Sequence, residues 1–364
     1  MLDFDYKVDK QGMLKTYLNW VDQVNYILSL DISCPSKFRV KQGCREYSPP
    51  KNIVICGLGG SGIAGDLVKD ALGEKIKVPM EVVKDYTLPP YSGEETLVIA
   101  ISYSGNTEET LSCYVQAIEK NCMVASISSG GYLKTFAEKT GGLHILLRPG
   151  YQPRASLPQL FFAVTRILEC LNIVPKIDYS EAIKILEENK ESLSPDKKDN
   201  EAMKLAKRLY QKIPVIYGHS FYRGTAHRLK KEFNENSKVP AKAEDFPELD
   251  HNDIVGWEDT ELSKVFTAIV LRDEEEYLTE RIEATIDIMK SYGAEIIELE
   301  SRAETKLAKI IDICHLGGVA SIYLALLYGR DPAQIKPISM LKERLSKKVG
   351  LQKKLLEKLE KLLG

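Results

Sequence analysis

The sequence of 364 residues has almost no net charge. Lysine and arginine (50) nearly balance aspartate and glutamate (52), which leaves a formal charge of −2 at pH 7. Proteins whose main partner is nucleic acid or a membrane surface usually carry a strong basic excess. The charge balance therefore favours a protein that acts on small molecules, with no nucleic acid and no membrane among its expected partners.

Patterns that usually hold metal ions or disulfide frameworks are also missing. The five histidines form no HxH or HExxH pattern, and the seven cysteines are scattered with no CxxC pair. Zinc sites depend on such spacings, so we expect no metal and no cofactor. An odd number of scattered cysteines in a chain of this size predicts free thiols in a reducing compartment.

Long hydrophobic runs are rare as well. The longest uncharged apolar stretch begins near Leu316 and stops at Gly329, which is shorter than the roughly 20 residues that a membrane helix needs. The start of the chain, Met1 to Lys7, carries acidic residues and no apolar segment, unlike a signal peptide. These absences predict a cytoplasmic protein.

Alternating strand and helix patterns predict an α/β fold, and the length suffices for two domains. Each alternating part predicts a doubly wound parallel sheet flanked by helices, with ligands at the carboxyl ends of its strands. A strand, a glycine, a polar residue and a helix stand at the head of both parts, which suggests a duplicated unit. The predicted segments are an N-terminal helical arm (1–49), a first domain (50–177), a helical linker (178–212), a second domain (213–335) and a C-terminal helix (336–364).

The strands are predicted from short apolar runs that end at turn residues. In the first domain they are expected at 52–56, 80–83, 96–101, 123–126 and 144–147. In the second domain they are expected at 214–217, 265–271 and 295–298.

A glycine cluster follows the first strand, where Gly57, Gly59 and Gly62 match the spacing GxGxxG. The next helix begins with unpaired N–H groups and a positive dipole end, which together favour an anion such as phosphate. A dinucleotide site would also need an acidic residue about 20 positions on, and the best candidate, Asp85, comes late. The motif alone leaves open a dinucleotide, a phosphate monoester or a plain tight turn, and Ile63 excludes a P-loop lysine.

A second loop, Ser102-Tyr-Ser-Gly-Asn-Thr107, follows the strand at 96–101 and precedes a helix. Three hydroxyls at this place can each donate a hydrogen bond to a phosphate oxygen, and no dinucleotide site requires them. The alternative is a helix cap with an acidic first turn, which explains Thr107 but not the other hydroxyls. Together the two loops favour a phosphate monoester.

Gly59-Gly60-Ser61 with Ser102–Thr107 resembles the sugar-isomerase (SIS) domain, in which two such loops hold the phosphate of a phosphosugar. Two tandem SIS domains resemble the phosphoglucose isomerase superfamily, and most of the chain is similar to its compact branch known from archaea, the bifunctional phosphoglucose/phosphomannose isomerases. The residues that the resemblance assigns to phosphate binding are Gly59, Gly60, Ser61, Ser102, Ser104 and Thr107.

The resemblance also implies an activity. It implies a glucose-6-phosphate and mannose-6-phosphate isomerase, acting in glycolysis and gluconeogenesis. Such an enzyme interconverts fructose 6-phosphate with both aldose hexose 6-phosphates by proton transfer through a cis-enediol, without a metal.

The resemblance places the catalytic base at Glu235, in the context Glu-Asn-x-Lys. Glu232, one helical turn earlier, is the alternative base. The ring-opening group is His251, which in the family reaches the active site of the other subunit, so a homodimer is implied. This sequence has Asp253 where the family generally carries glutamate, which leaves the orientation of the histidine open.

Two basic residues complete the implied site. Lys342 matches the C-terminal lysine of the family, which lies near the developing enediolate. Arg154 in the family faces the substrate, and its alternative is a surface ion pair at a helix start. His219 and His227 are interpreted as structural.

Two rival functions remain. A non-catalytic phosphosugar-binding SIS regulator would keep both loops but need neither Glu235 nor His251. It would usually add a DNA-binding head, but residues 1–49 show no basic helix-turn-helix pattern. A Rossmann-type dinucleotide oxidoreductase is less favoured, because its acidic residue is missing.

Overall fold

The computed structural model describes residues 3–346 and 350–364, and the chain divides into two compact units. Unit 1 comprises Met1–Val21 and Tyr179–Gln334, and unit 2 comprises Asp22–Asp178 and Ile335–Gly364. The five segments predicted from the sequence stay a prediction. In the structure, residues of the N-terminal arm occur in both units.

Unit 2 contains a five-stranded sheet in the order β4-β3-β5-β6-β7, and all its strands are parallel. Its strands are β3 (Asn52–Cys56), β4 (Met80–Val83), β5 (Thr96–Ile101), β6 (Met123–Ser128) and β7 (Leu143–Leu146). Every residue of β5 and β6 is buried, as expected for central strands covered on both faces. The predicted doubly wound parallel sheet is therefore confirmed here.

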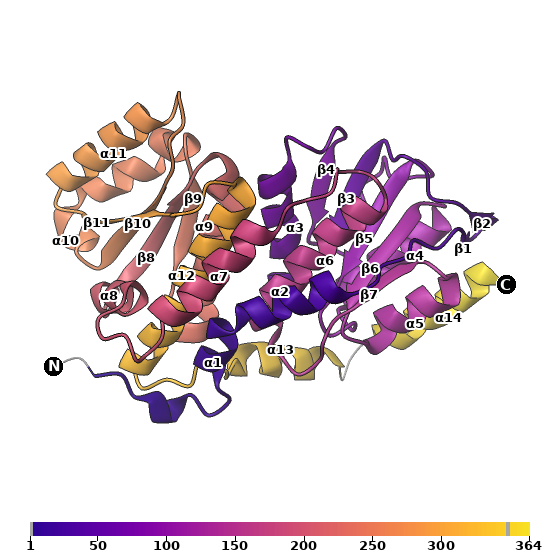
Figure 1. The fold of residues 1–364 in the computed structure, drawn as a ribbon, viewed down its shortest axis with the longest axis horizontal. Helices are drawn as coiled ribbons and strands as arrows, with labels where there is room; N and C mark the ends of the chain where they lie inside the picture. Colours follow the sequence, from indigo (N-terminus) through magenta and orange to yellow (C-terminus); the bar gives the residue numbers. More distant parts are fainter. Residues whose placement is uncertain (1–2, 347–349) are drawn as a thin grey trace. The chain divides into compact units, whose positions relative to one another are not determined.

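Helices cover both faces of this sheet (Figure 1). They are α2 (Trp20–Ser29), which begins in unit 1, α3 (Gly59–Leu72), α4 (Glu108–Glu119), α5 (Gly131–Thr140), η2 (Pro153–Ser156) and α6 (Leu157–Cys170). Helix α3 packs on α6, whereas α4 and α5 pack on the C-terminal helix α14 (Leu351–Leu363). A short antiparallel hairpin, β1 (Phe38–Val40) with β2 (Gly43–Arg45), was not expected from the sequence.

The C-terminal region is not one helix, so that prediction is wrong. Helix α13 (Lys336–Ser346) is followed by a separate helix, α14, and Gly350 at its start has a positive φ of 52°. Buried Leu355 and Leu359 hold α14 against unit 2, and Lys358 pairs with Glu119 of α4 at 2.7 Å. The second helix is stable because tertiary packing buries this leucine pair.

Unit 1 contains a four-stranded parallel sheet in the order β11-β10-β8-β9. Its strands are β8 (Ile213–Gly218), β9 (Lys242–Asp245), β10 (Phe266–Arg272) and β11 (Glu295–Glu300). In chain order this is the arrangement 2-1-3-4 that β3 to β6 also follow, which supports the predicted duplication. The sequence did not reveal β9, because this edge strand is short and charged.

The helices of unit 1 include a single turn of π-helix that matters for the site. They are η1 (Tyr6–Val8), α1 (Met13–Leu18), α7 (Ser180–Ser192), α8 (Glu201–Arg208), η3 (Ser220–Tyr222), α9 (Arg223–Glu232), the π-turn η4 (Phe233–Ser237), η5 (Glu248–His251), η6 (Asp253–Glu258), α10 (Thr260–Ser263), α11 (Thr279–Ser291) and α12 (Lys306–Leu327).

Helix α12 is long and apolar enough to cross a membrane by length and composition alone. The apolar segment is therefore longer than the stretch expected from the sequence. Its apolar window is nevertheless fully buried, and the helix packs on α7, α8 and α9 of its own unit. A buried core helix meets the same length criterion as a membrane span. We therefore describe α12 as the central core helix of unit 1.

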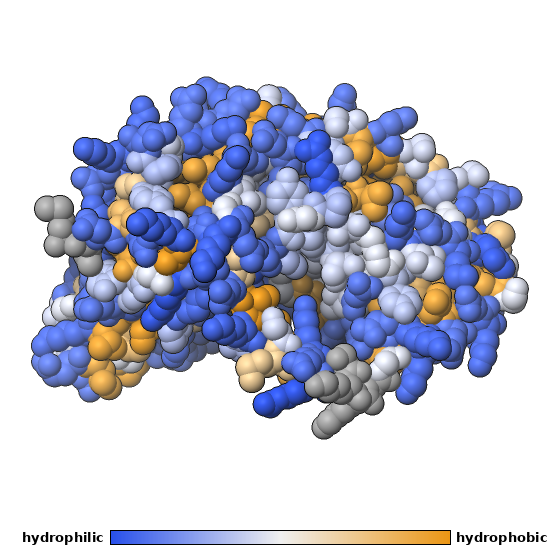
Figure 2. Space-filling model, turned by 90° about the horizontal axis from the view of Figure 1, so that it is seen from below, coloured by the Kyte–Doolittle hydropathy of each residue, from blue (hydrophilic) through white to orange (hydrophobic). Residues whose placement is uncertain are grey.

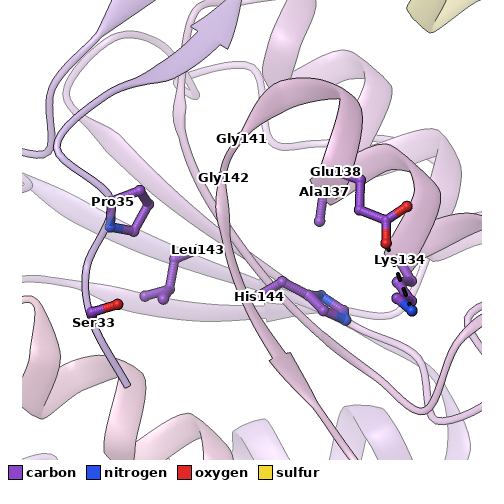
Figure 3. A pocket seen from close by; sticks show the side chains of 9 residues that line it. All are labelled: Ser33, Pro35, Lys134, Ala137, Glu138, Gly141, Gly142, Leu143 and His144. Carbon is purple, nitrogen blue, oxygen red and sulfur yellow. Dashed lines mark ion pairs between the residues drawn. The ribbon is translucent and has the colours of Figure 1, made fainter. Parts of the chain in front are cut away.

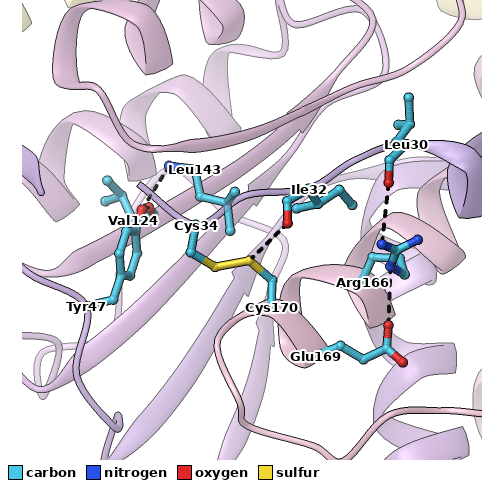
Figure 4. Close-up of a disulfide and its surroundings, with 9 residues drawn as sticks. All are labelled: Leu30, Ile32, Cys34, Tyr47, Val124, Leu143, Arg166, Glu169 and Cys170. Atoms are coloured by element: carbon cyan, nitrogen blue, oxygen red, sulfur yellow. Dashed lines mark hydrogen bonds and ion pairs between the residues drawn. A yellow bond between two sulfur atoms is a disulfide. The ribbon is translucent and has the colours of Figure 1, made fainter. Parts of the chain in front are cut away.

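A disulfide joins Cys34 to Cys170, the last residue of α6, so the expectation of free thiols throughout is wrong (Figure 4). The two Cα atoms are 6.2 Å apart, and the residues are 136 positions apart in the sequence. Nearby, Arg166 donates a hydrogen bond to the carbonyl of Leu30, which also ties α6 to the end of α2. The free cysteines are Cys44, Cys56, Cys113, Cys122 and Cys314.

Candidate active site

The two predicted phosphate loops lie side by side in unit 2. They follow β3 and β5, the neighbouring strands between which the strand order reverses. In doubly wound sheets, ligands bind outside the carboxyl ends of the strands at this switch point. The backbone N–H of Tyr103 in the second loop donates a hydrogen bond to the Ser61 hydroxyl in the first, at 3.2 Å.

The first loop depends on glycine for steric reasons. A Cβ atom at Gly62 would overlap the carbonyl oxygen of Gly57. A Cβ atom at Gly60 would lie 3.1 Å from the carbonyl oxygen of Pro153, so the loop is packed closely against η2. Leu58 occupies the N-cap position of α3 and its side chain makes no cap hydrogen bond. The Ser61 and Gly62 N–H groups donate to the Leu58 carbonyl, at 3.0 and 3.2 Å, and the positive end of the α3 dipole lies at this loop.

The second loop brings two of its hydroxyls together. Ser102 Oγ and Thr107 Oγ1 are 2.8 Å apart, and Ser102 is fully buried. Thr107 occupies the N-cap position of α4, but its side chain makes no cap hydrogen bond, so capping does not explain this residue. Ser104 is exposed, and its hydroxyl accepts a hydrogen bond from the Asn106 N–H at 3.2 Å.

The loop between β6 and α5 braces this second loop. The Ser129 N–H donates to the Tyr103 carbonyl at 2.8 Å, and the Leu133 N–H donates to the Gly105 carbonyl at 2.9 Å. Gly105 has a φ of 70°, and a Cβ atom there would overlap the carbonyl of Gly130. The hydroxyl loop is thus held by backbone contacts before any ligand binds.

Arg154 lies beside the first loop. It belongs to η2, and its Cα atom would be 3.4 Å from a Cβ atom at Gly60. Its side chain is only 3% exposed, which does not fit the alternative of a surface ion pair. Lys84 was not among the predicted site residues. It follows β4 and forms an ion pair with Asp66 of α3 at 2.6 Å. Its place at the carboxyl end of a strand is where ligand-binding residues of such sheets lie.

In unit 1, Glu235 is half-buried within the π-turn η4, which continues α9. Single π-turns occur often at functional sites. Glu232, the alternative base, is fully buried and forms an ion pair with the equally buried Arg228. Because Glu232 is enclosed and already neutralised, it cannot approach a substrate, and the structure favours Glu235 of the two.

His251 is exposed at the end of η5. The carboxylate of Asp253 accepts a hydrogen bond from the Tyr217 hydroxyl at 2.5 Å, and Trp257 donates to the same hydroxyl at 2.8 Å. Burial, followed by the charge of Asp253, raises the pKa of Tyr217 above its ordinary value, so the hydroxyl stays protonated. Asp253 is therefore engaged with the core of unit 1.

The two competing histidines differ in their surroundings, since His219 is enclosed and His227 is half-exposed. His219 is fully buried, and this burial lowers its pKa. The Nε2 atom of His227 lies 3.9 Å from a carboxylate oxygen of Asp245. Lys342 is exposed on α13 of unit 2.

No group of three or more histidine, cysteine, aspartate or glutamate side chains that could hold a metal ion occurs in the described part of the chain. A separate pocket of about 320 Å³ lies in unit 2 between α5, β7 and the segment after α2 (Figure 3). Its lining, as far as residues 3–346 and 350–364 show it, includes no predicted active-site residue. The Nδ1 atom of His144, in the wall of this pocket, shares a hydrogen bond of 2.8 Å with the Ser126 hydroxyl. Burial lowers the pKa of His144 to about 4.

Comparison with known proteins identifies both domains. Residues 46–144 match the SIS domain, and residues 198–345 match the bacterial phospho-glucose isomerase C-terminal SIS domain. The whole fold is similar to the C-terminal domain of glucosamine-fructose-6-phosphate aminotransferase from Francisella tularensis, with a TM-score of 0.67 and 18% identity over 90% of this chain and 99% of that one.

Two curated relatives are similar over most of their length. The bifunctional phosphoglucose/phosphomannose isomerase of Caldicellulosiruptor bescii is 39% identical over 81% of this chain and 89% of its own. That of Aquifex aeolicus is 37% identical over 86% of this chain and 96% of its own. The chain therefore belongs to the family of bifunctional phosphoglucose/phosphomannose isomerases and contains two SIS domains.

Proposed function

We propose that this protein is a metal-independent aldose–ketose isomerase that interconverts fructose 6-phosphate with glucose 6-phosphate and mannose 6-phosphate. The names of its relatives give the reaction. The observation that carries the proposal is the hydrogen bond from Tyr103 to Ser61, since it joins two hydroxyl-bearing loops into one possible phosphate site at the switch point.

The phosphate of the substrate is held by neutral donors in this proposal. The six residues predicted from the sequence are Gly59, Gly60, Ser61, Ser102, Ser104 and Thr107. Hydroxyls and the amides at the start of α3 are suited to a dianion that must bind and leave with each turnover. Arg154, buried beside the first loop, adds a positive charge directed at the sugar and the enediolate.

Glu235 is the proposed general base. It takes the proton from C2 of the aldose and returns it to C1, so the cis-enediol forms and collapses without any oxidant or reductant. A positioned carboxylate contributes roughly 10²- to 10⁴-fold to such a step. Lys342 supports the negative charge that develops on the oxygens, and His251 opens the sugar ring by moving a proton between the ring oxygen and the C1 hydroxyl.

A homodimer with His251 contributed to the partner subunit is part of the proposal. The exposed surface of His251 supports this, as do exposed apolar side chains nearby: Val255 is 59% exposed and Leu262 is 63% exposed. Isolated apolar residues are common on surfaces, but groups of them mark interaction sites. Figure 2 shows that the face it presents carries hydrophobic side chains in several groups among charged ones.

We also propose a cytoplasmic location and a role in glycolysis and gluconeogenesis, because the substrates of its relatives are hexose phosphates. The five free cysteines support a reducing compartment. The Cys34–Cys170 disulfide does not, although some intracellular proteins retain such bonds.

The test is a pair of coupled assays that follow glucose 6-phosphate and mannose 6-phosphate formed from fructose 6-phosphate, in the presence of EDTA. We expect both products, and a loss of about 10²- to 10⁴-fold in kcat for Glu235→Gln. Glu187→Gln, an exposed residue of helix α7 in the same unit, is the control and should keep full activity. Activity that EDTA abolishes, or full activity of Glu235→Gln, would contradict the mechanism, and tight binding without turnover would favour a regulator.

A further inference from the structure

A buried polar network lies directly beside Glu235 in unit 1. The Glu232 carboxylate forms an ion pair with Arg228, accepts a hydrogen bond from the Tyr17 hydroxyl at 2.6 Å, and accepts another from the Asn236 amide at 2.7 Å. All of these side chains are buried. A buried carboxylate is stable when its charge is paired and its lone pairs are hydrogen-bonded, and this one has three donors.

Tyr17 comes from the N-terminal segment, 215 positions before Glu232, and is held firmly. Its ring packs on α12 at Gly318, where a Cβ atom would lie only 2.6 Å from the ring. His315 of α12 donates from Nε2 to the Tyr17 carbonyl at 2.8 Å, because a carbonyl oxygen accepts. Trp20, one turn later, stacks on His315 with ring centroids 5.0 Å apart.

The π-turn that carries Glu235 is fixed from the same side. The Asn236 amide donates to the Ser321 hydroxyl at 2.9 Å, and the Ser237 hydroxyl donates to the Ser321 carbonyl at 2.6 Å. Arg330 donates to the carbonyls of Ser237 and Lys238, both at 3.0 Å. Glu235 thus lies between anchored residues on both sides, Glu232 before it and Asn236 after it.

We propose that Tyr17 is a positioning residue for the isomerisation, and that it fixes Glu235 through Glu232 and Asn236. The inference rests on the proposed function, because it assumes that Glu235 is the base. Proton abstraction from C2 requires the carboxylate to be held in reach of one carbon, and small misplacement of a catalytic group can cost 10²-fold in rate. The N-terminal segment is therefore part of the support for the active site.

Charge strengthens the same argument. Glu232 forms an ion pair with the buried Arg228, and the Tyr17 hydroxyl donates to the same carboxylate, so the network beside Glu235 is held by paired charges as well as by neutral donors.

The test is Tyr17→Phe, with Tyr323→Phe as matched control. Tyr323 is equally buried in unit 1, and its hydroxyl donates to the Leu193 carbonyl at 2.8 Å. For Tyr17→Phe we expect kcat on fructose 6-phosphate to fall about tenfold while KM stays within about twofold, because positioning acts on the chemical step. Tyr323→Phe should keep its kcat. Tyr17→Phe loses the hydrogen bond to Glu232 and the one from Asn236, whereas Tyr323→Phe loses the bond to Leu193, so both variants are assayed at a temperature where each is fully folded.

A second variant, Ser321→Ala, removes one acceptor of the Asn236 amide, which keeps its bonds to Glu232 and Tyr17, and should also lower kcat at constant KM. Equal kcat losses in the two tyrosine variants, or a change confined to KM, would overturn the inference. Glu235→Gln is measured in the same assay. If that variant stays active, the proposed base is wrong; if it is inactive and Tyr17→Phe matches its control, only the positioning role is wrong.

Discussion

The two sheets share one strand order but differ at the carboxyl ends of their strands. In unit 2, the loops after β3 and β5 carry glycines and the hydroxyls of Ser61, Ser102 and Thr107. In unit 1, the loop after β8, which corresponds to the loop after β3, carries the fully buried His219. The loop after β10 carries Asp273, which forms an ion pair with Lys309 at 2.6 Å. The same topology thus provides one switch point lined with phosphate-type donors and one filled by protein side chains.

Unit 1 contributes something else, a carboxylate at the end of α9. The π-turn η4 and the network around Glu232 present Glu235, and unit 2 has no equivalent turn among its described residues. The difference shows that chain topology provides the positions, whereas loop sequences decide which chemistry each position supports.

The largest effect should come from removing hydroxyl donors from the proposed phosphate site of unit 2. Replacing Ser102 by alanine and Thr107 by valine removes two hydroxyls 2.8 Å apart. Hydrogen bonds to charged groups are worth about 1.5 to 3 kcal/mol each, so we expect KM for fructose 6-phosphate to rise by about a hundredfold or more. Steady-state kinetics with fructose 6-phosphate as substrate measure this change in KM. Ser220→Ala, in the loop after β8 of unit 1, should change KM by less than about twofold, and equal effects in both units would refute the comparison.

Removing the disulfide should destabilise unit 2. The double change Cys34→Ser and Cys170→Ser releases a cross-link between residues 136 positions apart, so the free energy of unfolding should fall by about 2 to 4 kcal/mol. Denaturant unfolding measures the change. Cys44→Ser, a free and exposed cysteine of the same unit, is the control. A reductant should lower the stability of the wild type and leave the double variant unchanged.

Each unit also contains a neutral histidine, half-buried His144 in unit 2 and fully buried His315 in unit 1, that should make stability depend on pH. Burial lowers the pKa of His144 in unit 2 and of His315 in unit 1 to about 4. Between pH 6.5 and about 4 the unfolded chain binds protons that the folded chain does not, so stability falls as pH falls, by about 2 to 3 kcal/mol for each histidine. Denaturation at pH 7 and pH 4.5 should show this, with a smaller difference in His315→Gln. Equal stability at both pH values would contradict burial in the neutral form.

The smallest effects should come from two tightly packed glycines, Gly62 in the first turn of α3 and Gly218 at the end of β8. A Cβ atom at Gly62 would overlap the Gly57 carbonyl, and one at Gly218 would lie 2.6 Å from the Tyr222 carbonyl. We expect alanine at either position to cost about 1 to 2 kcal/mol of stability. Only Gly62→Ala should also raise KM, because only that glycine packs against Gly57 in a loop that we propose to bind phosphate. A raised KM in Gly218→Ala would show that the unit 1 switch point affects substrate binding.

Local patterns determined much of the fold. The bounds of β3, β4 and β5 agree with the sequence prediction, because an apolar run ending at glycine or a polar residue is a short-range signal. The two loops that we propose to bind phosphate were recognisable for the same reason: glycine and hydroxyl residues stand next to strand ends in the sequence itself. The roles assigned to Glu235, His251, Lys342 and Arg154 came from resemblance and stay proposals.

Only the tertiary structure decided the rest. The edge strand β9 is charged, the C-terminal region forms two helices, and Cys34 pairs with Cys170, none of which has a local signal. The sequence placed Glu232 beside Glu235 but could not show that Tyr17 and Arg228 enclose it. Side chains separated by more than a hundred positions meet only when the core packs, because burial and hydrogen bonding depend on the complete set of neighbours.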